Sequence, residues 1–203
     1  MKFIKTILFA LLSLLMFGCV YYSALYDITL TEVERPVDAK ERYGEQKVIR
    51  FEEEGKTKFS FEDEMIKLIW LPTTSQFNFL LMNKTKHSIK IIWDEAAYVD
   101  ENGSSKRIMH SGVKYSDRNN PQPPTTIVRG TTVSDIILPI DDFYGSLFSP
   151  YATRTEKESA DKAEQYVGKS VQVLLPLKIK EIVNEYIFSF KVNDFKVEKH
   201  TNY

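Results

Sequence analysis

Apolar and polar residues alternate along most of the chain after residue 27, and this period of two is typical of half-buried β-strands. The longest regular run puts five apolar residues on one face of a strand: Val171, Val173, Leu175, Leu177 and Ile179. Pro176 falls on the other face and has no backbone N–H to donate, so we expect an edge strand or a bulge there. Segments 77–81 and 89–93 alternate in the same way around a polar stretch, which predicts a central hairpin.

Turn residues and one change of parity divide the other predicted strands. Glu54-Gly55 lies between the alternating segments 47–52 and 58–62, and this dipeptide suits a hairpin turn. Near the C-terminus, the alternation of 186–192 continues with the opposite parity further along the chain. We therefore expect a bend or bulge at Asn193-Asp194 that returns the apolar side chains to the core.

One segment of the chain after the leader predicts a helix. A capping box begins at Thr155 and Gly168 suits the helix end, which predicts a short helix near 155–167. The segment 35–46 is charged, contains proline and glycine, and is predicted to be a loop. The pattern predicts a mainly β fold, and we interpret it as an antiparallel β-sandwich with an immunoglobulin-like arrangement. A partly open β-barrel is the alternative.

The first residues of the chain follow a different pattern. Two lysines form a basic head, and an uncharged apolar stretch, 7–17, leads to Gly18 and Cys19. A basic head, an apolar core and a small residue before the cleavage point are typical of a bacterial secretory leader. The positive head of such a leader stays in the cytoplasm. We therefore expect residues 1–18 to be a signal peptide.

The stretch Leu15-Met-Phe-Gly18-Cys19, with its cysteine directly after a small residue, resembles the lipobox of bacterial lipoproteins. The resemblance implies that a diacylglyceryl group is transferred to the Cys19 thiol. It also implies that the leader is cleaved between Gly18 and Cys19 and that the new amino group is then acylated. The remainder of the chain resembles uncharacterised envelope lipoproteins with a β-sandwich domain, and this likeness of architecture brings no functional site with it.

Two alternatives to a lipidated cysteine stay open. Residues 7–26 carry no charge and, at roughly 1.5 Å per residue, are long enough for an uncleaved membrane anchor. The other alternative is a plain secretory signal followed by a chance cysteine. Cysteine usage favours the lipoprotein, because Cys19 is the only cysteine of the chain and a lone thiol is a liability in an oxidising compartment.

Residues 19–26 are predicted to be the lipidated N-terminus and a short tether, and 27–203 a single β-rich domain. Because this tether lacks a long Gly/Ser/Asn stretch, we expect the domain to lie close to the membrane that its lipid enters. Enterobacterial lipoproteins with an aspartate after the cysteine are retained in the inner membrane, whereas Val20 follows Cys19 here. The resemblance therefore favours the outer membrane of the cell envelope, where the host has one.

Composition and charge limit the classes of partner. Without the leader and its two lysines, 25 basic and 28 acidic residues remain, which gives a net charge of −3. That balance favours neither a nucleic-acid-binding surface nor a polybasic membrane patch. With 43% apolar and 13% aromatic residues among 203, the chain fits one folded domain with a sizeable core.

Candidate catalytic groups are few. The three histidines have no second histidine or cysteine at metal-ligand spacing, so we expect neither a metal site nor a cofactor. His110 precedes Ser111, but successive side chains of a strand point to opposite faces, which argues against a Ser–His pair. Asp94 stands beside Trp93 and near Tyr98, and carboxylates beside aromatic rings suit a glycan site. A carbohydrate-binding or carbohydrate-active protein is therefore the alternative hypothesis.

The block from residue 93 to residue 125 is the main candidate binding surface. It joins predicted strand ends to a proline-rich loop, 112–125, and loops on a rigid sandwich are common recognition sites. The candidate residues are Trp93, Asp94, Tyr98, His110, Lys114, Tyr115, Arg118 and Pro123. The competing interpretation is a structural cap that the prolines rigidify. Our main hypothesis is a non-enzymatic binding or assembly module of the envelope, with an unidentified envelope protein or glycan as partner and no nucleic acid.

Overall fold

The computed structural model describes residues 20–73, 76–140, 153–154 and 162–201. The predicted leader, Cys19 and the first part of the predicted helix at 155–167 lie outside these residues. The strands are β1 (Val20–Glu34), β2 (Lys47–Glu53), β3 (Lys56–Glu62), β4 (Ile66–Pro72), β5 (Phe77–Asn83), β6 (Ile89–Ile91), β7 (Ala97–Val99), β8 (Ser105–Met109), β9 (Thr125–Ile127), β10 (Thr132–Pro139), β11 (Thr153–Arg154), β12 (Ser170–Ile179) and β13 (Ile182–Thr201). The helices are α2 (Ala39–Tyr43) and the 3₁₀ helices η1 (Trp93–Glu95), η2 (Tyr115–Asp117) and η3 (Lys162–Tyr166).

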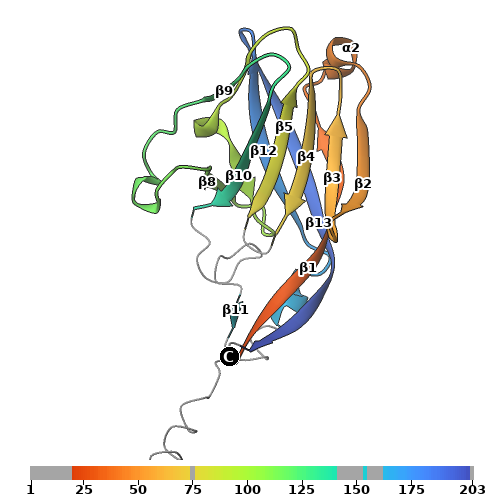
Figure 1. Ribbon diagram of the computed structural model, residues 1–203, viewed down its shortest axis with the longest axis vertical. Helices are drawn as coiled ribbons and strands as arrows, with labels where there is room; N and C mark the ends of the chain where they lie inside the picture. The colour runs from red at the N-terminus through yellow and green to blue at the C-terminus, as the bar shows by residue number, and fades with distance from the viewer. Residues whose placement is uncertain (1–19, 74–75, 141–152, 155–161, 202–203) are drawn as a thin grey trace, which may run out of the picture.

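The strands form one antiparallel sheet that folds back on itself (Figure 1). Its main path runs β11-β1-β13-β12-β7-β8-β10-β5-β4-β3-β2. Off this path, β6 pairs with β12 and β9 pairs with β6. β8 pairs with β7 and with β10, and so joins the layer of β1, β13 and β12 to the layer of β2 to β5 and β10. The predicted mainly β, antiparallel fold is confirmed. The sheet is nearly closed and barrel-like, which fits either a sandwich or a partly open barrel.

Aromatic side chains fill the space between the two layers. Trp70 of β4 lies 5.1 Å from Phe188 and 5.7 Å from Phe190 of β13, measured between ring centroids. Phe61 of β3 lies 5.6 Å from Phe188. The five alternating residues of the predicted strand at 171–179 are all buried, as expected for a face turned to this core. The core therefore follows from the period-two pattern of the sequence.

The position of Pro176 corrects one prediction. β12 is not an edge strand, because it pairs with β13 on one side and with β6 and β7 on the other. The Pro176 carbonyl accepts a hydrogen bond from the Ile92 N–H at 3.1 Å, so the proline faces the gap between β6 and β7. The backbone N and O of one strand residue point to the same side. The N–H group that Pro176 lacks would therefore point into this gap, where no neighbouring strand needs it.

The predicted central hairpin is also wrong. β5 pairs with β4 and β10, whereas β6 pairs with β12 and β9 in the opposite layer. Asn83, fully buried at the crossing, donates its side-chain amide to the carbonyls of His87 (2.8 Å) and Ile127 (3.0 Å). These bonds turn the chain from one layer to the other instead of closing a hairpin. The turn predicted at Glu54-Gly55 is confirmed between β2 and β3.

The predicted tether is part of the first strand. β1 starts at Val20, and its residues pair in sequence with the end of β13, from Val20 opposite Thr201 to Asp27 opposite Asp194. The next pair is Ile28 with Val192, so the register shifts at Asn193. This shift confirms the bulge predicted at Asn193-Asp194. The paired ends of β1 and β13 project below the rest of the sheet in Figure 1.

Two short helices depart from the prediction. α2 lies in the segment 35–46, where a loop was predicted, because Ala39 and Tyr43 are buried and hold the turn against the core. In the other segment, where a helix was predicted near 155–167, the described part is the 3₁₀ helix η3. Gly168 follows it with a φ of +82°, as its predicted place at the helix end requires.

Candidate functional site

The aromatic residues of the predicted binding surface are in the core. Trp93 is 1% exposed and Tyr98 is 0% exposed, so neither ring offers a face to a glycan. The Trp93 indole N–H donates to the Thr125 hydroxyl at 2.8 Å, which fixes the ring beneath the proline-rich loop. The alternation of apolar residues that placed Trp93 on a strand face already indicated burial. The carbohydrate hypothesis therefore loses its stacking platform.

Asp94 and its neighbours tie the proline-rich loop to the sheet. Asp94 is exposed, and its Oδ1 accepts from the Gln122 backbone N–H at 3.0 Å and from Arg107 at 3.3 Å. Arg107 also donates to the Asn119 carbonyl at 3.0 Å. The Gln122 side chain is buried and donates to the Ile108 carbonyl at 2.7 Å. These bonds give Asp94 a structural role in holding the loop.

His110 is mostly buried between a ring and a carboxylate. It stacks on Trp93 with ring centroids 4.2 Å apart, and its Nδ1 lies 3.3 Å from Asp135 Oδ2. The other oxygen of Asp135 accepts from the Ser111 backbone N–H at 2.7 Å. Asp135 therefore holds the chain at this turn through two neighbouring residues. This arrangement contains no nucleophile aligned with the histidine.

The remaining four residues of the predicted surface lie on the proline-rich loop. Lys114, Tyr115 and Pro123 are exposed, and Arg118 is half-buried. The Arg118 guanidinium lies 4.0 Å from the Tyr115 ring centroid and donates to the Tyr115 carbonyl at 3.0 Å. Apart from the exposed Asp94, only this part of the predicted surface faces solvent. The described residues contain no group of three or more metal-ligating side chains.

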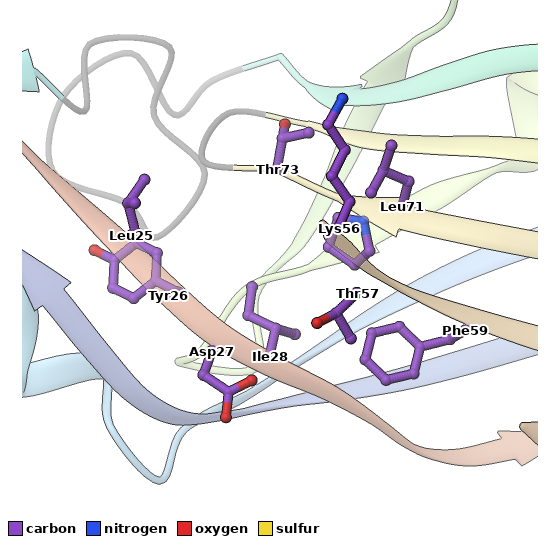
Figure 2. A pocket seen from close by; sticks show the side chains of 10 residues that line it. Leu25, Tyr26, Asp27, Ile28, Lys56, Thr57, Phe59, Leu71 and Thr73 are labelled. Carbon is purple, nitrogen blue, oxygen red and sulfur yellow. The ribbon is translucent and has the colours of Figure 1, made fainter. Parts of the chain in front are cut away.

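A pocket of about 400 Å³ opens at the lower end of the two layers, between β1 and the ends of β3 and β4 (Figure 2). Its lining comes from ten residues: Leu25, Tyr26, Asp27, Ile28, Lys56, Thr57, Phe59, Leu71, Pro72 and Thr73. Ile28 and Phe59 are buried at its wall, and Leu25 is 37% exposed. Sequence reasoning missed this pocket, because its three lining segments lie far apart in the chain.

The charges at the pocket are mixed. Asp27 pairs with Arg50 at 3.4 Å, and the Thr57 hydroxyl donates to Glu52. Lys56 makes no ion pair with any other described residue. Apart from these groups, the pocket wall is mostly apolar.

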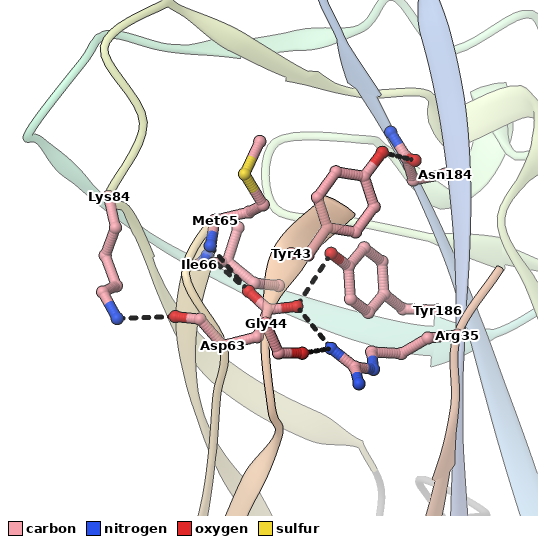
Figure 3. A network of polar contacts seen from close by, with 9 residues as sticks. All are labelled: Arg35, Tyr43, Gly44, Asp63, Met65, Ile66, Lys84, Asn184 and Tyr186. Carbon is pink, nitrogen blue, oxygen red and sulfur yellow. Dashed lines mark hydrogen bonds and ion pairs between the residues drawn. The ribbon is translucent and has the colours of Figure 1, made fainter. Parts of the chain in front are cut away.

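A buried polar network lies at the opposite end of the domain, near α2 (Figure 3). Asp63 accepts hydrogen bonds from the backbone N–H groups of Met65 (2.8 Å) and Ile66 (2.9 Å) and from the Tyr186 hydroxyl (3.2 Å). The Arg35 guanidinium lies 3.5 Å from the same carboxylate. Four donors on one buried carboxylate make this a structural anchor rather than a reactive group.

The tyrosines of this network have raised pKa values. Burial is the main reason that the pKa of Tyr186 lies far above its usual value, and the negative charge of Asp63 adds to the effect. Burial also raises the pKa of Tyr43, whose hydroxyl donates to Asn184. Both phenols therefore stay neutral at ordinary pH and act as hydrogen-bond donors.

Comparison with known proteins adds no relative. No family model, no curated protein and no solved structure matches this chain. Among the described residues, no helix is long and apolar enough to cross a membrane.

Proposed function

We propose that this chain is a lipid-anchored protein of the bacterial cell envelope and that its β domain is a non-enzymatic binding or assembly module. The lipid on Cys19 binds the membrane, and the partner of the domain is an envelope protein or a glycan. The outer membrane is the proposed site where the host has one, because Val20 and not an aspartate follows the cysteine.

The strand pairing of Val20 is the observation that supports this proposal best. Val20, the residue directly after the proposed acylation site, already lies in β1 and pairs with Thr201 at the end of β13. A lipid on Cys19 would therefore join the chain only one residue before the folded domain, so the domain would lie close to the membrane. The absence of a catalytic arrangement around His110, Asp94 and the pocket, among the residues described, favours a binding role over an enzymatic one.

Mass spectrometry of the mature N-terminus tests the anchor. The purified protein is expected to begin at Cys19 and to carry the mass of a diacylglyceryl group and, where the host adds it, a further acyl chain. The variant Cys19→Ser controls for the modification and should keep the uncleaved leader. An intact Met1 with an unmodified Cys19 would replace the lipid anchor by a transmembrane one, and a cleaved, unmodified chain would make the protein secreted.

A further inference from the structure

The outer face of the layer formed by β2, β3, β4, β5 and β10 departs from the usual pattern of a half-buried sheet. Outward positions of such a sheet are normally polar. Here the central row across the strands is Ile49, Ser60, Ile69, Leu80 and Ser134. Ile49 is 41% exposed and Leu80 is 42% exposed. The neighbouring rows add Met82, which is 39% exposed, and the half-buried Phe51 and Leu71.

Lysines stand at both ends of this apolar band. The strand register puts Lys47 and Lys67 in the row of Met82, with Lys67 directly beside it. Lys58 lies beside Phe51 at the other end, and Lys56 follows in the next row. Among the paired residues of these five strands, the same face carries two carboxylates, Glu53 and Glu62. Glu53 pairs with Lys58, and Glu62 contacts both Lys67 (3.7 Å) and Lys84 (2.8 Å). We call this band and its lysines the lysine-rich face.

Two of these lysines are free to bind an external anion. Lys47 and Lys56 are exposed, and neither makes an ion pair with a described residue. The face therefore carries net positive charge, although the chain without its leader is net negative. Whole-chain composition, which argued against a polybasic membrane patch, averages over this asymmetry.

One hollow on the face suits small apolar groups, and the larger pocket between the layers opens at its lower edge. A pocket of about 210 Å³ lies over the small Ser60 and is lined by Ile49, Phe51, Lys67 and Ile69. Leu71 and Lys56 also line the larger pocket beside β1. An exposed apolar patch of this kind marks an interaction surface, and cations around it favour an anionic partner.

We propose that the lysine-rich face docks on an anionic lipid surface. This inference rests on the proposed function, because the lipid on Cys19 holds the domain within reach of that surface. Tethering turns docking into an intramolecular event, so a few lysines and a modest apolar area are sufficient to orient the domain. The lipid headgroups meet the lysines, and the apolar band enters the boundary between headgroups and acyl chains.

The test uses the full chain in vesicles, with an environment-sensitive dye on a cysteine placed at Leu80. The matched reporter is Lys178→Cys on β12, in the opposite layer. In vesicles of phosphatidylcholine with phosphatidylglycerol, the dye at Leu80 should shift to the blue and be quenched by a lipid-borne quencher, and the dye at Lys178 should not. In phosphatidylcholine alone, or at high salt, the difference should disappear, because the attraction is electrostatic.

Neutralising the unpaired lysines tests the charge requirement. Lys47→Gln and Lys56→Gln should each lower the ratio of docked to undocked domain about fivefold. The control Lys90→Gln, on β6 of the other layer, should leave the ratio unchanged, and thermal melts verify that all variants fold.

Each contrary result overturns the proposal. These results are an equal dye response at the two positions, the same response without anionic lipid, and no effect of the lysine variants. A shift at Leu80 only on adding an envelope protein extract would assign the face to a protein instead. The chain without an engineered cysteine is the control that separates this test from the test of the anchor. If that chain takes up the dye, Cys19 is a free thiol, which contradicts the proposed lipid anchor but not the docking of the lysine-rich face.

Discussion

Asp63 is a buried carboxylate on which three separate segments of the chain converge. It holds its own turn through Met65 and Ile66, reaches Tyr186 of β13, and contacts Arg35 after β1. Its side chain is fully buried and that of Arg35 is 10% exposed. Hydrogen bonds to a charged group in such surroundings stabilise more than neutral ones.

The variant Asp63→Asn should therefore lower the free energy of unfolding by about 3 kcal/mol. An amide cannot accept from all four donors, and it leaves the Arg35 charge buried without a partner. Urea denaturation measures the loss. The control Asp117→Asn, on the exposed turn of η2, should change stability by less than about 0.5 kcal/mol. Equal effects of the two substitutions would contradict the anchoring role of Asp63.

The raised pKa of Tyr186 makes the domain sensitive to alkali. In the unfolded chain a tyrosine ionises near pH 10, whereas in the fold Tyr186 keeps its proton to higher pH. Above pH 10 the folded state binds more protons than the unfolded state. The free energy of unfolding therefore falls as pH rises, by about 1.4 kcal/mol per pH unit for this group. Below pH 10 its contribution is fully present.

Urea denaturation between pH 9 and pH 11 measures that slope. The variant Tyr186→Phe should be less stable at pH 8, because Asp63 loses a donor, but its stability should fall less steeply above pH 10. Tyr115→Phe, on an exposed ring, controls for the loss of one phenol elsewhere. A slope that Tyr186→Phe leaves unchanged would show that another group governs the alkaline loss.

At the scale of elements, α2 depends on the glycine that ends it. Gly44 has φ +70° and ψ −170°, a backbone region that glycine alone adopts readily. A Cβ built there would also come within 2.7 Å of the Glu64 carboxylate oxygen. The carbonyl of Gly44 accepts from Arg35 at 3.0 Å, so the same residue joins α2 to the end of β1.

Gly44→Ala should accordingly destabilise the domain by about 2 kcal/mol. Most of this cost comes from the backbone, because the Glu64 side chain is flexible enough to move away. Adding Glu64→Ala should restore only a small part of the lost stability, with Glu64→Ala alone as the reference. Complete recovery in thermal melts of the double variant would assign the cost to crowding instead.

The sequence predicted which side of each strand is buried much better than it predicted which strands pair. Alternation is a local property, so the buried face of 171–179 and the bulge at Asn193 followed from it directly. Pairing depends on the path of the chain between strands, which is why β5 and β6 were wrongly joined. The prediction of an edge strand or a bulge at Pro176 failed for the same reason, because the gap that accommodates the proline lies between two neighbouring strands, β6 and β7.

The candidate site was predictable only where the local sequence pattern indicates whether a single residue is buried. Trp93 continues the apolar alternation of 89–93 and Tyr98 lies on β7, so burial was the simpler expectation for both. The pocket beside β1 and the lysine-rich face combine residues from three or more strands. No local signal in the sequence brings Lys47 and Lys56 to one surface with Leu80, because that requires the register of four strands.

At the scale of the whole molecule, the domain has a compact body and a projecting two-stranded ribbon. The ribbon consists of residues 20–27 of β1 and 194–201 of β13, beyond the bulge at Asn193 (Figure 1). Within the described residues, a third strand supports it only at Tyr22 and Ser23, through β11. Two-stranded ribbons are marginal on their own, so this part should open without unfolding the body.

Hydrogen exchange measured by mass spectrometry tests this division. Backbone amides of 24–27 and 194–201 should exchange more than about tenfold faster than those of β4 and β12, which have strands on both sides. Ending the chain after Asn193 should leave the exchange of β4 and β12 almost unchanged, because the core residues of the body remain. If that truncation instead exposes the whole domain to exchange, the ribbon and the body form one cooperative unit.

A ribbon that opens independently has a consequence for docking. The lipid on Cys19 joins the chain at the ribbon, whereas the lysine-rich face belongs to the body, so the angle between them decides whether that face can reach the bilayer. Local opening at the bulge supplies this freedom without any loss of core packing. Deleting Asn193 would remove the extra residue and continue the ladder past Ile28 in one register, with Phe195 and Val197 still on the face of Val192. We therefore expect this variant to fold but to show a weaker response of the dye at Leu80 in anionic vesicles, whereas unchanged docking would place the flexible point elsewhere.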